Sequence, residues 1–346
     1  MNTPVLAALA AAALFGASTP FAKALLGSVP PVLLAGLLYA GSGIGLSLAR
    51  LARDRGFEAA RLSRAEWPWL LGAIIVGGVL GPLLLMYGLG RTSAADASLL
   101  LNLEAVLTAL FAWIVFRENA GRRIVLGMTL IVGGGVVLAW PSGHSGATSL
   151  AGASSVAAAC ACWALDNNLT RKVSASDPLF IAATKGLVAG STNVALALVL
   201  GARLPPAALT AAVMGVGFLG YGVSLVLFVL ALRGLGSARA GAYFSTAPFV
   251  GAALAIVGFG EPVSWLFWVA AALMAAGVWL CLTEVHEHEH VHEALTHAHA
   301  HRHDAHHQHE HDFNWDGFEP HTHEHTHALL VHRHPHYPDV HHRHEH

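Results

Sequence analysis

LNLEAVLTALFAWIVFRE at residues 101–118 and FSTAPFVGAALAIVGFGE at residues 244–261 are the two stretches that decide the fold. Each stretch is apolar over most of its length, carries polar residues near its start and ends in glutamate. An α-helix needs about 20 predominantly apolar residues to cross a bilayer. Two matching stretches of this kind predict a membrane protein built from a duplicated unit.

The sequences around these two stretches match as well. LFGASTPFAKALL (14–26) aligns with CWALDNNLTRKVS (162–174), and PPVLLAGLLYAG (30–41) aligns with DPLFIAATKGLV (177–188). Each half holds five apolar segments, and an odd number turns the second copy upside down in the membrane. Inverted repeats are typical of secondary transporters, whose substrate site lies near the midplane between the halves.

The composition also indicates a polytopic membrane protein. The chain has 346 residues and only 12% of them are charged, whereas soluble domains carry about 25%. We predict an all-α integral membrane protein with ten transmembrane helices as two inverted five-helix repeats, residues 1–141 and 149–284, followed by a disordered tail, 285–346. The predicted spans are 5–26, 31–51, 67–88, 92–116, 122–140, 149–171, 178–201, 207–232, 237–259 and 263–283.

The distribution of Lys and Arg predicts the orientation. The loops on the side of the N-terminus hold twelve Lys and Arg residues, whereas the opposite loops hold two, Arg91 and Arg203. Basic residues collect on the cytoplasmic side of a bilayer. We therefore expect an inner (plasma) membrane protein with both termini in the cytoplasm. The first apolar segment lacks the basic start of a signal peptide, so it counts as a span.

Glu104 is the polar residue of most interest, because it lies near the middle of a predicted span. A charge at mid-bilayer costs at least about 2.5–3.5 kcal/mol and normally faces a cavity or a partner. On one continuous helix, Ala97, Leu101 and Thr108 would share its face. One interpretation is a carboxyl that couples transport to protons. The other is a protonated structural glutamate that packs two helices.

The next apolar segments add an acid and a base. Asp166 and Lys185 lie on consecutive antiparallel spans at similar predicted depths, so we expect them to pair. Lys185 could bind an anionic group of a substrate, or the pair could be structural and orient the two helices. Lys23 is expected to snorkel toward the outer surface. Further candidates to line a substrate cavity are Asn102, Asn167, Asn168 and Tyr243.

Histidine dominates the tail: residues 286–346 hold 23 of the 24 histidines, and three Arg against eleven acids give a formal charge of −8. Imidazole suits Zn, Ni, Cu and Co. Metal binding for an export path, metal or pH sensing, and low complexity without a cellular role all stay open. Candidate ligands for Zn, Ni or Co are His286, His288, His290, His292, His297, His299, His301 and His303.

The whole arrangement resembles the drug/metabolite transporter superfamily, and in particular its EamA-type permeases. The matching motifs are LFGASTPFAK (14–23), RTSAADASLLLNLEAVLTALFAWIVFRE (91–118), GMTLIVGGGVVLAW (127–140) and VAAALMAAGVWL (269–280). Ala105 departs from the family pattern, which usually has proline after the glutamate. Leu38 stands where a basic residue is often found, and the tail lies outside the pattern. The resemblance implies export of small metabolites or drugs by alternating access without ATP hydrolysis.

The sequence contains no motif that indicates another functional class. No phosphate-binding GxxxxGK[ST] loop and no nucleophile–base arrangement are present, so we expect neither an enzyme nor a required cofactor. The basic stretch between Arg50 and Arg64 follows from the orientation, and no nucleic acid partner is expected. The expected partners are a small-molecule substrate and the lipid bilayer. Divalent metal ions and a second copy in a homodimer stay open, as does divalent metal efflux (Zn, Ni or Co) as the alternative function.

Overall fold

The structure is a computed structural model of the whole chain. It describes residues 3–54, 62–116, 122–140, 149–173, 176–283, 286–292, 295–301, 321–327 and 330–336.

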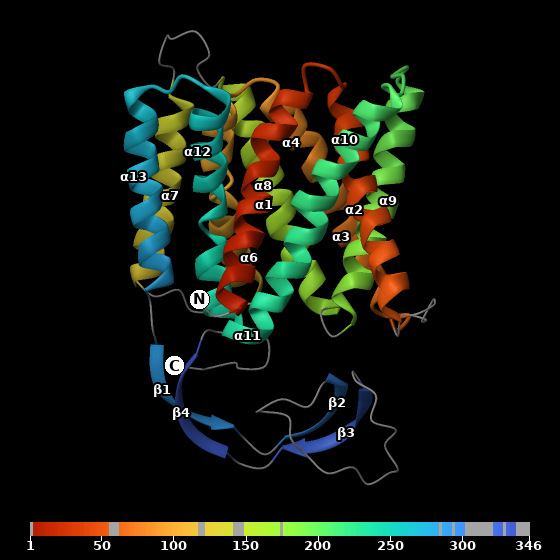
Figure 1. Cartoon of the computed structure of the whole chain (residues 1–346). Coiled ribbons are helices and arrows are strands. Elements are labelled where there is room, and N and C mark those ends of the chain that lie inside the picture. Colours follow the sequence, from red (N-terminus) through yellow and green to blue (C-terminus); the bar gives the residue numbers. More distant parts are fainter. Residues whose placement is uncertain are drawn as a thin grey trace.

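The described helices form one upright bundle (Figure 1). The elements of the first half are α1 (Thr3–Leu25), α2 (Pro31–Asp54), α3 (Trp67–Ala73), η1 (Ile74–Leu80), α4 (Gly81–Leu89), α5 (Ala94–Leu100), α6 (Leu103–Phe116) and α7 (Arg122–Ala139). Those of the second half are α8 (Leu150–Thr170), η2 (Arg171–Val173), α9 (Pro178–Val199), α10 (Ala207–Gly217), η3 (Phe218–Val223), α11 (Ser224–Phe244), α12 (Ala247–Phe259) and α13 (Trp265–Leu282). Within the described residues, eight helices are long and apolar enough to cross a membrane, and α12 is a shorter apolar helix.

Large apolar side chains on the outside of the bundle are the surface that a bilayer covers. Val257 is 86% exposed and Val199 is 84% exposed, and Trp140, Trp265 and Leu150 are exposed as well. In water such a surface would be unfavourable, because exposed apolar area carries a free-energy cost. In lipid the same surface is solvated, which makes this a multi-pass membrane protein.

The two halves also share an unusual backbone conformation at equivalent positions. The third span of each half contains a π-helical segment, η1 in the first half and η3 in the second. The offset that places Leu101 on Phe244 also places Ile74 on Gly217 and Leu80 on Val223, so the two π segments coincide to within one residue. The repeat therefore extends to a rare local conformation.

The two stretches that open the sequence analysis both contain a break in the helix. Leu101 and Asn102 form a turn between α5 and α6, and Ser245 and Thr246 form the corresponding turn between α11 and α12. The predicted continuous span 92–116 is therefore two helices. The predicted loop between the spans 207–232 and 237–259 also differs from the structure, because α11 continues as a helix to Phe244.

Helix packing follows the same symmetry. α2 packs on α9 and α7 packs on α13, and each is a pair of equivalent spans from the two halves. α1 lies against α11 and α12, as α8 lies against α4 and α6. Close approach depends on glycine: a Cβ on Gly186 would come within 2.6 Å of Gly43 Cα, and one on Gly277 within 2.5 Å of Gly127 O. Small residues allow such contacts between membrane helices.

The described parts of the tail form strands, β1 (His286–His292), β2 (Leu295–His301), β3 (His321–His327) and β4 (Leu330–His336). β1 pairs with β4 and β2 pairs with β3, both antiparallel. In Figure 1 they lie beyond the end of the bundle where α1 begins and α13 ends. The alternation of histidine with other residues has the period of a strand.

Candidate functional site

The predicted pair of Asp166 and Lys185 is present and joins α8 to α9. Lys185 Nζ lies 2.6 Å from Asp166 Oδ1 and 2.7 Å from Asp166 Oδ2. Thr170 Oγ1 donates to Asp166 Oδ1 at 2.9 Å, one turn along α8. Asp166 is 6% exposed. Lys185 is thus occupied by a buried carboxylate, and the pair is neutral as a unit.

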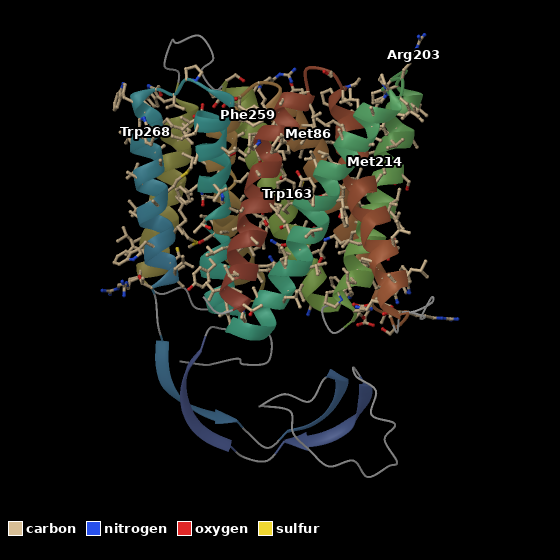
Figure 2. All side chains as sticks on the ribbon, viewed as in Figure 1. Met86, Trp163, Arg203, Met214, Phe259 and Trp268 are labelled. Carbon is tan, nitrogen blue, oxygen red and sulfur yellow. The ribbon has the colours of Figure 1, made fainter. Side chains whose placement is uncertain are left out.

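The π segment η1 packs against this pair through Gly77. A Cβ on Gly77 would lie 2.0 Å from Asp166 Oδ2, so only glycine leaves room for the carboxylate. Gly77 O accepts hydrogen bonds from Trp163 Nε1 at 2.9 Å and from Tyr39 OH at 3.2 Å. Figure 2 shows Trp163 near the middle of the bundle. The buried Asn193 donates to the adjacent Gly78 O at 3.5 Å.

A second polar group lies between the halves of the chain. Asn167 Nδ2, on α8, donates to Glu104 Oε1 at 3.0 Å and to Thr108 Oγ1 at 3.4 Å, both on α6. Glu104 and Thr108 share a face, as expected. Ala97 and Leu101 do not belong to that face on one helix, because the turn at 101–102 separates α5 from α6.

The two carboxylates of this region have different partners. Asp166 is paired with Lys185, whereas Glu104 is bound by an amide. Among the residues that the structure describes, no Lys or Arg lies within 4.0 Å of the Glu104 carboxylate. Asn167 is exposed and Glu104 is partly exposed, so this group is accessible in a way that Asp166 is not.

The other predicted cavity residues lie elsewhere or are already bonded. Asn102 is buried, and its Nδ2 donates to Leu99 O at 2.8 Å within the helix break. Asn168 Nδ2 donates back to Ala164 O at 2.8 Å. Tyr243 packs with the α1–α11 cluster around Ala8. None of these three joins the group around Glu104 in the contacts described.

The predicted metal ligands fall in the tail. His286, His288, His290, His292, His297, His299 and His301 lie on β1 and β2, whereas His303 lies outside the described residues. Where side chains are described, no group of three His, Cys, Asp or Glu could hold a metal ion.

Lys23 and Glu261 fix the opposite end of the bundle. Lys23 Nζ donates to Leu89 O and, at 2.7 Å, to Thr92 O, so it binds the turn between α4 and α5. The Glu261 carboxylate accepts from Ala94 N at 3.0 Å and Ala95 N at 2.9 Å at the start of α5. Both residues serve the fold, since helix ends need partners for their free backbone groups.

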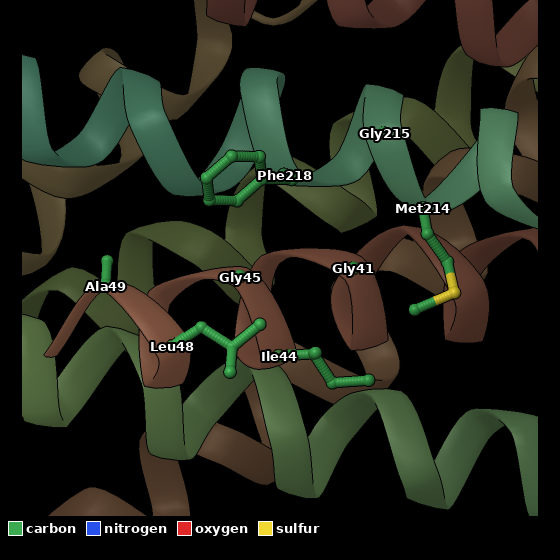
Figure 3. A pocket seen from close by; sticks show the side chains of 8 residues that line it. All are labelled: Gly41, Ile44, Gly45, Leu48, Ala49, Met214, Gly215 and Phe218. Atoms are coloured by element: carbon green, nitrogen blue, oxygen red, sulfur yellow. The ribbon is translucent and has the colours of Figure 1, made fainter. Parts of the chain in front are cut away.

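A shallow apolar groove of about 580 Å³ runs between α2 and the α10–η3 segment (Figure 3). Its sides include the exposed Ile44 and Leu48 from α2 and Phe218 from η3. A Cβ on Gly45 would lie 2.1 Å from the Phe218 ring, which shows how closely the two helices meet. The groove belongs to the outer apolar surface, not to the polar group around Glu104.

Several of these residues carry no signal in the sequence. One example is the contact of Gly77 with Trp163 and Tyr39, which come from three different spans. They meet because the Gly77 carbonyl in η1 faces the side-chain donors of Trp163 and Tyr39. Thr170 is the exception, since its spacing of four from Asp166 puts both on one helix face.

Comparison with known proteins gives consistent matches. The sequence profile of the EamA-like transporter family matches residues 2–140 and, a second time, residues 150–283. An uncharacterized transporter of Methanothermobacter thermautotrophicus is 30% identical over 281 residues, 77% of this chain and 82% of the relative. A probable 4-amino-4-deoxy-L-arabinose-phosphoundecaprenol flippase subunit ArnE of Pseudomonas aeruginosa is 39% identical over 112 residues, 31% of this chain and 93% of the relative. A solved crystal structure has the same fold, with a TM-score of 0.61 at 22% identity over 81% of this chain and 95% of that chain.

Proposed function

The chain belongs to the EamA-like transporter family, and from that membership we propose that it exports small metabolites or drugs by alternating access, with Glu104 as its proton-carrying group. Membership makes the protein a membrane transporter of small molecules. The direction of transport, the coupling to protons and the role of Glu104 are the proposal.

The observation that carries the proposal is the difference between the two carboxylates. Asp166 is neutralised by Lys185, so neither residue is free to bind a charged substrate in this conformation. Glu104 is held by Asn167 and has no cation beside it among the described residues. An unpaired charge near mid-bilayer is costly, so in the proposed cycle Glu104 carries a proton in one conformation and gives it up in the other.

The position of Glu104 supports a role in alternating access. Glu104 lies on α6 in the first half and Asn167 lies on α8 in the second half. In transporters with inverted repeats, one half moves against the other around a site at their interface. A hydrogen bond across that interface is made or broken by such a movement, which links the protonation of Glu104 to the conformation.

The test measures proton-coupled export directly. Everted membrane vesicles that hold an acid-inside pH gradient receive amino acids, nucleosides or cationic dyes, and a fluorescent amine reports proton release. At least one class of solute should dissipate the gradient with the wild type and should fail to do so with Glu104→Gln. The rate should depend on pH in the wild type only.

The matched control is Glu66→Gln, which makes the same chemical change at a partly exposed carboxylate that accepts from Ser63 N outside the predicted spans. This variant should transport as the wild type does. Transport by Glu104→Gln with an unchanged pH dependence would refute the proposed coupling role.

Metal efflux was the alternative from the sequence, and we propose a small organic substrate instead. None of the predicted spans contains histidine, which is the commonest protein ligand for Zn, Ni and Co. We also propose that the protein lies in the inner (plasma) membrane. Both of its termini would then lie in the cytoplasm. A homodimer stays a proposal to be tested by the mass of the detergent-solubilised protein.

A further inference from the structure

The turn between α4 and α5 lies at the distal end of the bundle, which is the end opposite the N-terminus. Lys23 Nζ, near the end of α1, donates to two carbonyls of this turn. The Glu261 carboxylate, which follows α12, accepts from the first two N–H groups of α5. Figure 2 shows Phe259, the last residue of α12, at the same end. We refer to Lys23, Glu261 and residues 89–95 as the distal contact.

The distal contact joins the two halves of the chain. Glu261 belongs to the second half, whereas α5, which it binds, belongs to the first. α12 packs along α5 next to this contact, and a Cβ on Gly251 would lie 2.8 Å from Ser98 Oγ. Lys23 holds the turn that precedes α5. Any movement that separates the halves at the distal end must therefore break the hydrogen bonds of Glu261.

The repeat-related pair of helices differs in its packing. The offset that places Leu101 on Phe244 relates α12 to α6 and relates α5 to the last turns of α11. Within the described residues, α12 packs on α5, whereas α6 and α11 make no comparable contact. The two equivalent interfaces between the halves are therefore in different states, with the distal one closed.

The backbone differs at the same place. Residues 90–93 lie outside the helices and form the turn between α4 and α5, whereas the equivalent residues, 233–236, continue the helix α11. Gly234 and Gly236 lie in this part of α11. Glycine is a poor helix former, so the sequence at 233–236 is compatible with a turn as well as with a helix.

A buried hydroxyl supports the view that the interface between α5 and α12 opens. Ser98 is 1% exposed, and its Oγ has no hydrogen-bond partner among the described residues. A buried polar atom without a partner costs free energy. Water can supply a partner once α5 and α12 separate, so opening of this interface relieves that cost.

We propose that the distal contact is a gate, in which Lys23 and Glu261 hold the distal end closed in this conformation and release the start of α5 in the other. In transporters with inverted repeats, one half moves against the other and the two ends open in turn. The different states of the two equivalent interfaces are what such a cycle requires. The gate rests on the alternating access of the proposed function, but it needs neither proton coupling nor Glu104.

The test measures access to the interface between α5 and α12 in the full-length protein in detergent. The three native cysteines are replaced by alanine, and Ser98→Cys, a nearly isosteric change, supplies one buried thiol. A polar maleimide should label this thiol slowly. Glu261→Ala and Lys23→Met should each raise the labelling rate about tenfold, because a hydrogen bond to a charged group contributes enough to shift a two-state equilibrium by that factor.

Two controls separate a gate from a general loosening of the bundle. Glu66→Ala removes a carboxylate that accepts from Ser63 N outside the distal contact, and it should leave the labelling rate unchanged. A second reporter, Ala270→Cys, places the thiol at a fully buried position of α13, which packs on α7. Glu261→Ala should not raise labelling there. If Glu261→Ala raises labelling at both reporter positions alike, or at neither, the gate is refuted.

The labelling uses neither a solute nor a proton gradient, so its result is separate from that of the Glu104→Gln test. A raised rate at Ser98→Cys, together with an unchanged pH dependence of transport by Glu104→Gln, would keep the gate and remove the proton coupling. An unchanged rate would remove the gate and leave the proposed function intact.

Discussion

Gly77 is the position where the π segment and the buried ion pair meet, and a single methyl group there should be harmful. A Cβ would lie 2.0 Å from Asp166 Oδ2, so Gly77→Ala must displace the carboxylate from Lys185. Overpacking of this kind costs about 1–3 kcal/mol. We expect a lower thermal unfolding temperature in detergent and reduced transport.

The control for this substitution is Gly133→Ala in α7. Nothing lies within 4 Å of a Cβ at Gly133, so alanine there should be neutral or should stabilise the helix by about 0.5–1 kcal/mol. Equal unfolding temperatures of the two variants would contradict the packing that we describe around Gly77.

The Asp166–Lys185 pair should behave as a unit in a double-mutant cycle. Removal of one partner leaves a buried charge and costs about 3–5 kcal/mol, whereas removal of both is less harmful. Asp166→Asn and Lys185→Met should each lower the unfolding temperature strongly, and the double variant should recover part of the loss. Transport that recovers with stability marks the pair as structural. Transport that stays lost in a stable double variant marks a substrate role.

At the scale of elements, the C-terminal end of α2 is bound to the start of α9 by ion pairs. Arg53 Nη2 lies 2.6 Å from Asp177 Oδ2, and Arg50 Nε lies 3.4 Å from the same oxygen. Asp177 is also the N-cap of α9 and accepts from Leu179 N at 3.0 Å. One side chain therefore starts one helix and holds the end of another.

This contact predicts a pH dependence. Partial burial raises the pKa of Asp177, but the hydrogen bonds from Arg53 and Leu179 outweigh it, so the pKa lies below its ordinary value of 3.8. The stability from the charged form is then complete above pH 3.8 and is lost as the pH falls below it. The difference in unfolding temperature between wild type and Asp177→Asn should therefore shrink from pH 7 to pH 3. A difference that stays constant over this range would argue against the ionic contribution.

The equivalent elements of the two halves have similar backbone structures but different polar side chains. By the repeat alignment, Ser18 corresponds to Asp166 and Gly220 to Gly77, and a Cβ on Gly220 would lie 2.6 Å from Ser18 Cβ. The same close contact thus exists in both halves, with a hydroxyl in one and a carboxylate in the other. Leu38 stands where the second half has Lys185. The buried charges therefore break the symmetry of the repeat.

At the scale of the whole molecule, an even number of crossings puts both ends of the chain on one side. α1 begins and α13 ends at the same end of the bundle (Figure 1). Because the loops at that end are rich in Arg, we predict that a fluorescent reporter fused after His346 is active in the cytoplasm, whereas a reporter that works only outside is inactive. The opposite result would reverse the topology and leave the fold intact.

Deletion of the tail should separate its role from transport. A chain that ends at residue 285 keeps every helix of the bundle, so its unfolding temperature and its transport of the solute found above should match the full chain. Tolerance of cells to zinc, nickel and cobalt is the second measurement. A change in tolerance with unchanged transport would assign the tail a metal role of its own.

The sequence by itself determined the membrane-spanning class, the five-plus-five repeat and the pairing of Asp166 with Lys185. Apolar length and the spacing of charges are local properties, and consecutive antiparallel helices are neighbours whatever their rotation. The same reasoning predicted that Glu104 faces a cavity or a polar partner, because a charge near mid-bilayer is costly without one.

Beyond the Asp166–Lys185 pair, only the tertiary structure decided which polar groups meet. The helix break at Asn102 changes the direction of α6, and the π segment brings Gly77 O to Trp163 and Tyr39. Such contacts depend on the rotation and depth of helices from distant parts of the chain. Helix packing sets both, and no local sequence pattern predicts them.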